Sequence, residues 1–134
     1  MAVRSPLINV MVNAAYKAAR GLVRDFGEVE QLQVSRKGVA DFVSTADLKA
    51  EKVLKQELGK ARPRFSFLME ESGATAAAAG GEQEPEGRWI VDPLDGTTNF
   101  LHGIPHFCIS IGVEKAGEIV AGVIYEPVRD ELFW

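Results

Sequence analysis

The sequence has a single cysteine and no long apolar run, and these two absences narrow the class of protein. One cysteine, Cys108, excludes an internal disulfide framework and favours a reducing compartment. No stretch approaches the ~20 apolar residues that span a bilayer. The N-terminal segment has charges distributed through it and lacks the separate apolar core of a signal peptide. We therefore expect a cytoplasmic protein that does not engage a membrane.

An excess of positive charge is also missing. The 134 residues include 15 Lys and Arg against 19 Asp and Glu, which gives a net charge of −4. Such a surface does not attract nucleic acid or anionic lipid in general, so we expect no direct contact with nucleic acid. A bound phosphate would have to be held locally, by metal ions or by backbone N–H groups. The hydrophobic content of 46% is that of an ordinary globular domain.

The pattern of apolar residues predicts an α+β fold. A first helix is expected from Ser5, as N-cap, to Gly27, and a second helix from Ser44 to about Gly59. Between them, residues 28–42 are expected to form a loop or weak hairpin. Residues 73–87 are small and polar and predict a mobile surface connection. Strands are expected at 65–69, 88–91, 107–114 and 118–125, and from residue 131 onward.

Acidic residues follow two of the expected strands. Glu70 comes directly after one strand and Asp92 after another, and Asp95 lies three residues beyond Asp92 across Pro93 and Leu94. Proline stiffens the turn, so the two aspartates can point to the same side. Crowded carboxylates repel one another unless protons or cations intervene. Because all-oxygen sites favour hard cations, this set predicts a Mg²⁺ site, to which the Leu94 carbonyl can add a neutral ligand.

The residues after Asp95 suit a phosphate group. Gly96 lets the backbone approach a ligand closely, and a short helix is expected to open through Asn99. Amides at a helix start bind phosphate oxygens, and the Thr97 hydroxyl is a plausible partner for Glu70 in orienting a water molecule. Together, these features predict metal-assisted hydrolysis of a phosphate ester.

Each fragment alone also has an ordinary structural interpretation. Glu-Glu-Ser after a strand is usually an exposed turn, and Asp-Pro-x-Asp-Gly is a frequent turn composition. Asp47 fits a first-turn helix acid stabilised by the helix dipole. His102 and His106 have no nearby charged partner in the sequence and are more often structural, and Cys108 fits a small buried strand residue.

Taken together, three segments resemble the inositol monophosphatases, and two others, LHGIPHF at residues 101–107 and GVIYEP at 122–127, resemble the bacterial members in particular. The longest is WIVDPLDGTTNF at residues 89–100, preceded by EES at 70–72 and DFVSTAD at 41–47. The resemblance implies the layered αβαβα sandwich of the inositol monophosphatase and sugar phosphatase type, with two helices packed on an antiparallel sheet. Since family members are about twice as long, residues 1–134 are expected to be the N-terminal portion, with the second half absent. A sheet that stops at Trp134 would expose apolar surface.

The resemblance also implies a set of metal ligands. Glu70, Asp92 and the Leu94 carbonyl would hold a first Mg²⁺, and Asp92 and Asp95 a second. The second metal is expected to bind weakly, because an aspartate from the absent half completes its site. A third, weaker Mg²⁺ would lie by Glu70. The loop from Lys37 to Asp41 would move over the site.

Catalytic and substrate roles follow from the same resemblance. Glu70 and Thr97 would position and deprotonate the attacking water, and Asp47 would support Thr97. The amides of Gly96 and Thr97 would bind phosphate, with Asp95 also near the substrate hydroxyls.

The implied function is Mg²⁺-dependent hydrolysis of a small phosphorylated polyol, inositol monophosphate above all, by an enzyme that is a homodimer at full length. One alternative is a related bisphosphate phosphatase acting on fructose 1,6-bisphosphate or phosphoadenosine phosphate. Another is a non-catalytic role with the transcription and ribosomal RNA machinery, through a protein partner. A third is that the chain is an inactive fragment.

Overall fold

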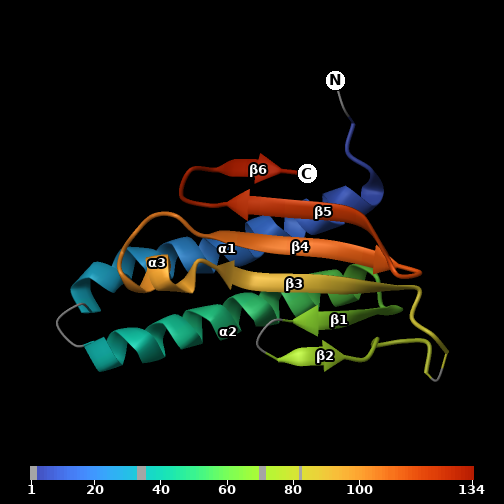
Figure 1. Ribbon diagram of the computed structural model, residues 1–134, viewed down its shortest axis with the longest axis horizontal. Helices are drawn as coiled ribbons and strands as arrows, with labels where there is room; N and C mark the ends of the chain where they lie inside the picture. The colour runs from blue at the N-terminus through green and yellow to red at the C-terminus, as the bar shows by residue number, and fades with distance from the viewer. Residues whose placement is uncertain (1–2, 33–35, 70–71, 82) are drawn as a thin grey trace.

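Two long helices lie together behind one sheet (Figure 1). The structure is a computed structural model that describes residues 3–32, 36–69, 72–81 and 83–134. Within these residues, no helix is both long enough and apolar enough to cross a bilayer. The elements are α1 (Pro6–Leu32), α2 (Arg36–Ala61), β1 (Phe65–Met69), β2 (Gly73–Thr75), β3 (Gly87–Asp95), α3 (Thr97–Leu101), β4 (Cys108–Lys115), β5 (Glu118–Glu126) and β6 (Glu131–Phe133).

The sheet is mixed, which corrects the antiparallel sheet expected from the sequence. Its six strands run in the order β2-β1-β3-β4-β5-β6, and β1 and β3 pair in parallel while every other pair is antiparallel. The reason is β2, which folds back along Phe67–Met69 of β1, so that the chain returns toward the end where β1 began. Since β3 then starts with Gly87 beside Phe65, it runs in the same direction as β1. The polar segment after Met69 is therefore partly strand.

The first helix begins as predicted and ends later. The backbone N–H of Ile8 donates a hydrogen bond of 3.2 Å to the Ser5 hydroxyl, as expected of an N-cap. The helix continues through Gly27 to Leu32, because Val29 extends the buried stripe by another turn. Gly27 has no neighbour within 4 Å of where a Cβ would be, so it is an interior helical residue and not a terminator.

The second helix begins at Arg36 and not near Ser44, so the loop or hairpin expected over residues 28–42 is wrong. Val39 and Val43 are buried against the rest of the core and continue the spacing of the later part of the helix. The moving loop expected from Lys37 to Asp41 likewise lies in the first turns of α2. The expected end of this helix, near Gly59, is close to the observed Ala61.

The core lies between the two helices and the sheet, and it extends beneath α3. There, the ring of Phe100 packs against the ring of Phe107 at a centroid distance of 4.9 Å and against Phe26 of α1 at 5.4 Å. All three side chains belong to the core or pack directly on it. This aromatic cluster anchors the short helix α3, and with it the residues that precede α3.

On the opposite face of the sheet, the part over β4, β5 and β6 is apolar and exposed, as expected from the sequence. Ile119, Ile124, Phe133 and Trp134 are all large apolar side chains in contact with solvent. They line part of a shallow hollow of about 420 Å³ over β4, β5 and β6. The helices thus cover only one of the two faces of the sheet (Figure 1).

Candidate functional site

An irregularity in β3 turns two aspartates toward the same face of the sheet. Side chains alternate between the two faces of a strand, so Asp92 and Asp95, three residues apart, would point to opposite faces of a regular strand. The pairing with β4 shifts between them, because Asp92 lies opposite Ser110 and Asp95 lies opposite Cys108. A step of three residues in β3 therefore matches a step of two in β4, and this β-bulge restores both carboxylates to one face.

Burial along β3 shows where the extra residue lies. From Gly87 to Asp92, buried residues alternate with less buried ones, and then Pro93 and Leu94 are buried in succession. Asp95 is exposed as a result. Pro93 and Leu94 thus face the core, and the carboxylates on either side of them, Asp92 and Asp95, face outward.

The bulge is held by local hydrogen bonds. The backbone N–H of Leu94 donates to Oδ1 of Asp92 at 3.2 Å, and the Thr97 hydroxyl donates to the Leu94 carbonyl at 3.1 Å. The Leu94 carbonyl, expected as a metal ligand, therefore already accepts one bond, and its second lone pair has room for another. These contacts fix the positions of Asp92 and Thr97 with respect to the same residue, Leu94, the first through its N–H and the second through its carbonyl.

Gly96 makes the sharp turn from β3 into α3. Its φ of 96° and ψ of 37° are in the left-handed region, and its carbonyl accepts a 3.0 Å bond from the N–H of Phe100. A Cβ at this position would lie 3.0 Å from the His106 carbonyl oxygen and 3.2 Å from Cα of Phe107. Both the backbone conformation and the space therefore require glycine.

We expect Gly96→Ala to lower the free energy of unfolding by about 1–3 kcal/mol, because alanine is strained at positive φ and its methyl group presses on residue 106. Urea denaturation followed by circular dichroism measures this change. Gly27→Ala is the matched control and should be neutral or slightly stabilising, since Gly27 is helical with open space around it. Equal midpoints for the two variants would contradict the requirement for glycine at position 96.

Several carboxylates surround the one cysteine. The Cys108 thiol donates to Oδ2 of Asp95 at 3.8 Å. Burial, followed by the negative charges of Asp95 and Asp92, raises the pKa of Cys108 to about 11. The thiol therefore stays protonated at neutral pH and does not act as a nucleophile. The negative charges of Asp95 and Asp92 add to this rise in the pKa, after burial.

Two adjoining cavities form at this end of the sheet. The first, of about 300 Å³, is lined by Asp92 and by residues 94–99. The second, of about 330 Å³, shares Asp95, Gly96 and Asn99 with the first and extends to His106 and Glu126. Carboxylates, a hydroxyl and a left-handed turn are thus gathered around one hollow.

Comparison with known proteins agrees with this geometry. A model of the inositol monophosphatase family matches residues 3–134. The chain belongs to the inositol monophosphatase family.

Relatives within this family are similar over nearly the whole chain. The inositol-1-monophosphatase of Mesorhizobium japonicum is 62% identical over 130 residues, which are 97% of this chain and 47% of the relative. The Nus factor SuhB of Escherichia coli K12 is 38% identical over 128 residues, 96% of this chain and 46% of the relative. The crystal structure of the extragenic suppressor protein SuhB from Bartonella henselae superimposes with a TM-score of 0.80 at 56% identity and covers 96% of this chain and 47% of that one. The chain thus spans about half the length of these members of the family.

Five of the residues singled out from the sequence line the first cavity together: Asp92, Leu94, Asp95, Gly96 and Thr97. Asp47 is buried in α2, a helix that contacts α3, and its support of Thr97 stays a prediction. Glu70 lies outside the described residues. Its roles as metal ligand and as partner of Thr97 therefore also stay predictions. Strand β1 ends at Met69, which pairs with Val91, the residue before Asp92.

The donor set on this face fits a hard divalent cation in the inositol monophosphatase fold. Among the described residues, no three His, Cys, Asp or Glu side chains are grouped closely enough to hold a metal by themselves. Mg²⁺, however, takes one or two carboxylates and completes its shell with water and substrate phosphate. Asp92 and Asp95, on one face beside a turn with room for phosphate, supply that number of carboxylates.

Two features of the site could not be read from the sequence. Nδ1 of His106 lies 3.1 Å from Oε1 of Glu126, 20 residues further along the chain, and the Asn99 side-chain amide donates to the His106 carbonyl at 2.8 Å. Pairing of β4 with β5 brings Glu126 to this end of the sheet. Glu126 belongs to the GVIYEP segment at residues 122–127, but nothing in that segment indicates that its carboxylate contacts His106.

Proposed function

We propose that this chain contributes the catalytic face of a Mg²⁺-dependent phosphatase that hydrolyses phosphate monoesters, with inositol monophosphate as its main substrate. The observation that carries the proposal is the bulge in β3, which places Asp92 and Asp95 on one face directly before the Gly96 turn. The 62% identity to a relative named inositol-1-monophosphatase supports the choice of substrate.

The residues divide into a metal-binding group and a phosphate-binding group. Glu70, Asp92 and the Leu94 carbonyl would hold a first Mg²⁺, and Asp92 and Asp95 a second. When bound, Mg²⁺ neutralises phosphate charge and lowers the pKa of a coordinated water molecule.

The chain's own polar groups would bind the phosphate and position the attacking water. The backbone N–H groups of Gly96 and Thr97 would bind phosphate oxygens, since both residues line the cavity, Gly96 just before α3 and Thr97 as its first residue. The Thr97 hydroxyl donates to the Leu94 carbonyl, so its oxygen lone pairs are left to accept a hydrogen bond from water. Glu70 would take the proton of that water, with Asp47 supporting Thr97.

We expect phosphate release from inositol 1-phosphate to require Mg²⁺ and to fall to background when a chelator is added. Calorimetric titration of the chain with Mg²⁺, run beside a phosphate-release assay, measures binding and turnover separately. Fructose 1,6-bisphosphate serves as the comparison substrate and should be hydrolysed more slowly. Phosphate release that continues at the same rate in chelator would refute the proposal.

A second candidate function is binding to the transcription machinery. The observation that favours it is the name Nus factor SuhB given to the 38% identical relative from Escherichia coli. With a net charge of −4, the chain would reach nucleic acid only through a protein partner. An Asp95→Asn chain that binds transcription proteins normally but hydrolyses no phosphate ester would separate this function from catalysis.

A further inference from the structure

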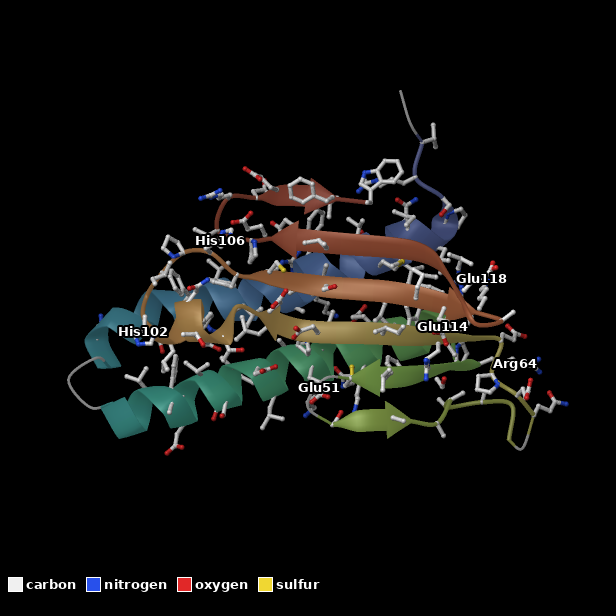
Figure 2. The ribbon with its side chains drawn as sticks, viewed as in Figure 1. Glu51, Arg64, His102, His106, Glu114 and Glu118 are labelled. Carbon is white, nitrogen blue, oxygen red and sulfur yellow. The ribbon has the colours of Figure 1, made fainter. Side chains whose placement is uncertain are left out.

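We propose that Glu126, acting through His106, is a positioning residue for the phosphate-binding turn at Gly96. The inference rests on the function proposed above for that turn. It concerns a contact between two elements distant in sequence, the end of β5 and the segment between α3 and β4 (Figure 2).

The turn has almost no free space behind it. A Cβ on Gly96 would lie 3.0 Å from the carbonyl oxygen of His106 and 3.2 Å from both Cα and Cβ of Phe107. The backbone at residues 106 and 107 therefore supports the turn directly. Close-packed groups transmit small displacements to their neighbours, so a shift of residue 106 shifts Gly96.

Hydrogen bonds hold the supporting segment from the α3 side. The Asn99 side-chain amide donates to the His106 carbonyl at 2.8 Å, and the Asn99 carbonyl accepts from the N–H of Ile104 at 2.8 Å. These bonds tie the segment to α3, and α3 itself follows the turn. They maintain the local shape of the segment but do not connect it to β5.

The connection to β5 comes from the imidazole. A carboxylate only accepts hydrogen bonds, so Nδ1 of His106 donates to Oε1 of Glu126 at 3.1 Å. The Glu126 side chain is only 11% exposed, and Nε of Arg129 lies 3.6 Å from the same oxygen. Glu126 is therefore the fixed partner, and it holds the imidazole of His106, whereas Asn99 holds the backbone carbonyl of the same residue.

The exposure of His106 argues for a local role. Its side chain is 67% exposed, so water competes for the bond to Glu126 and the bond contributes little to the free energy of unfolding. His106 lines the second cavity, while the first, next to the Thr97 hydroxyl, is formed without it. The His106–Glu126 pair can therefore affect the position of the Gly96 turn without contacting the groups proposed to react.

Two substitutions at one position test this role. His106→Asn keeps an N–H donor near the place of Nδ1, while His106→Gln moves the donor away along a longer side chain. The reporter is hydrogen exchange of the Phe100 amide, which donates to the Gly96 carbonyl at 3.0 Å. We expect exchange to speed up about three- to fivefold in His106→Gln and in Glu126→Ala, and to stay within about twofold of wild type in His106→Asn.

Glu114→Gln provides the matched control. Glu114 also pairs with a cation, Arg88, at 2.9 Å, but it lies at the opposite end of β4 (Figure 2). This substitution should leave Phe100 exchange unchanged. Equal exchange in the Asn and Gln variants of His106, or an equal effect of Glu114→Gln, would overturn the proposal.

Binding of inorganic phosphate in the presence of Mg²⁺ separates this inference from the proposed function. We expect about three- to fivefold weaker phosphate binding in His106→Gln and wild-type binding in His106→Asn. If the wild-type chain binds no phosphate, the proposed function of the turn fails, whereas the exchange measurement still decides whether Glu126 positions it. If phosphate binds the wild type and both variants equally, the positioning role is wrong.

Discussion

Replacing Asp92 with asparagine should weaken Mg²⁺ binding by at least about a hundredfold and reduce phosphate release to background. The amide has nearly the same shape as the carboxylate but no charge, so it is a poor ligand for a hard cation. Loss of even an outer partner of a metal site typically costs about 10- to 100-fold in affinity or activity, and Asp92 is proposed as a direct ligand. Calorimetry with Mg²⁺ and the inositol 1-phosphate assay measure the two effects.

The fold should survive this substitution. The Asp92 side chain accepts a hydrogen bond from the N–H of Leu94, and the carbonyl oxygen of asparagine can accept the same bond. Glu118→Gln is the control, because it also exchanges an acid for its amide but lies on the β4–β5 hairpin at the far end of the sheet (Figure 2). Wild-type Mg²⁺ affinity in Asp92→Asn would remove Asp92 from the metal site.

Truncation of Trp89 to alanine should lower the free energy of unfolding by about 3–5 kcal/mol. Trp89, near the start of β3, is 0% exposed, and its ring packs against Phe65 at a centroid distance of 5.1 Å. Its indole N–H is buried without a hydrogen-bond partner among the described residues. The loss therefore comes from the cavity and the missing ring contacts, and no hydrogen bond adds to it.

The second tryptophan supplies a matched control. Trp134 is 51% exposed on the uncovered face of the sheet, so Trp134→Ala should change stability by no more than about 0.5 kcal/mol. Urea denaturation followed by far-ultraviolet circular dichroism compares the two variants without relying on tryptophan fluorescence. Similar midpoints for both would show that Trp89 does not hold the core together.

The strands were predictable because their apolar runs are short and bounded by turn residues. The run Phe65–Met69 was expected with its exact bounds, and the hairpin between β4 and β5 turns at Ala116 and Gly117, both with positive φ. The start of α2 was not predictable in the same way. Its buried residues there, such as Val39 and Val43, are few and separated by polar ones, and they become a helical face only when α1 packs against them.

The parallel pairing of β1 and β3 also depends on long-range structure. The sequence around Phe65 and around Gly87 does not indicate that the short strand β2 reverses the chain between them. Sequence pattern sets which residues form a strand, but the neighbours of a strand follow from how connections pack in three dimensions.

In the candidate site, the residues of one continuous motif were recognisable and those brought in from elsewhere were not. Asp92, Asp95 and Gly96 carry a distinctive spacing, and the structure places them around one cavity. Glu126 is separated from His106 by two strand segments and a hairpin, so only the pairing of β4 with β5 reveals that they meet. Residue type alone did not distinguish Glu126 from the other acids of the chain.

The bulge at Pro93 and Leu94 makes the number of residues in this stretch as important as their identity. Deleting Leu94 would restore regular alternation and leave the carboxylates two positions apart, still on one face but without the Leu94 N–H and carbonyl that tie Asp92 to Thr97. Inserting one would give an even spacing of four and carry Gly96 away from its support at His106. Length variation among functional homologues should therefore be confined to other connections, such as the polar stretch between β2 and β3.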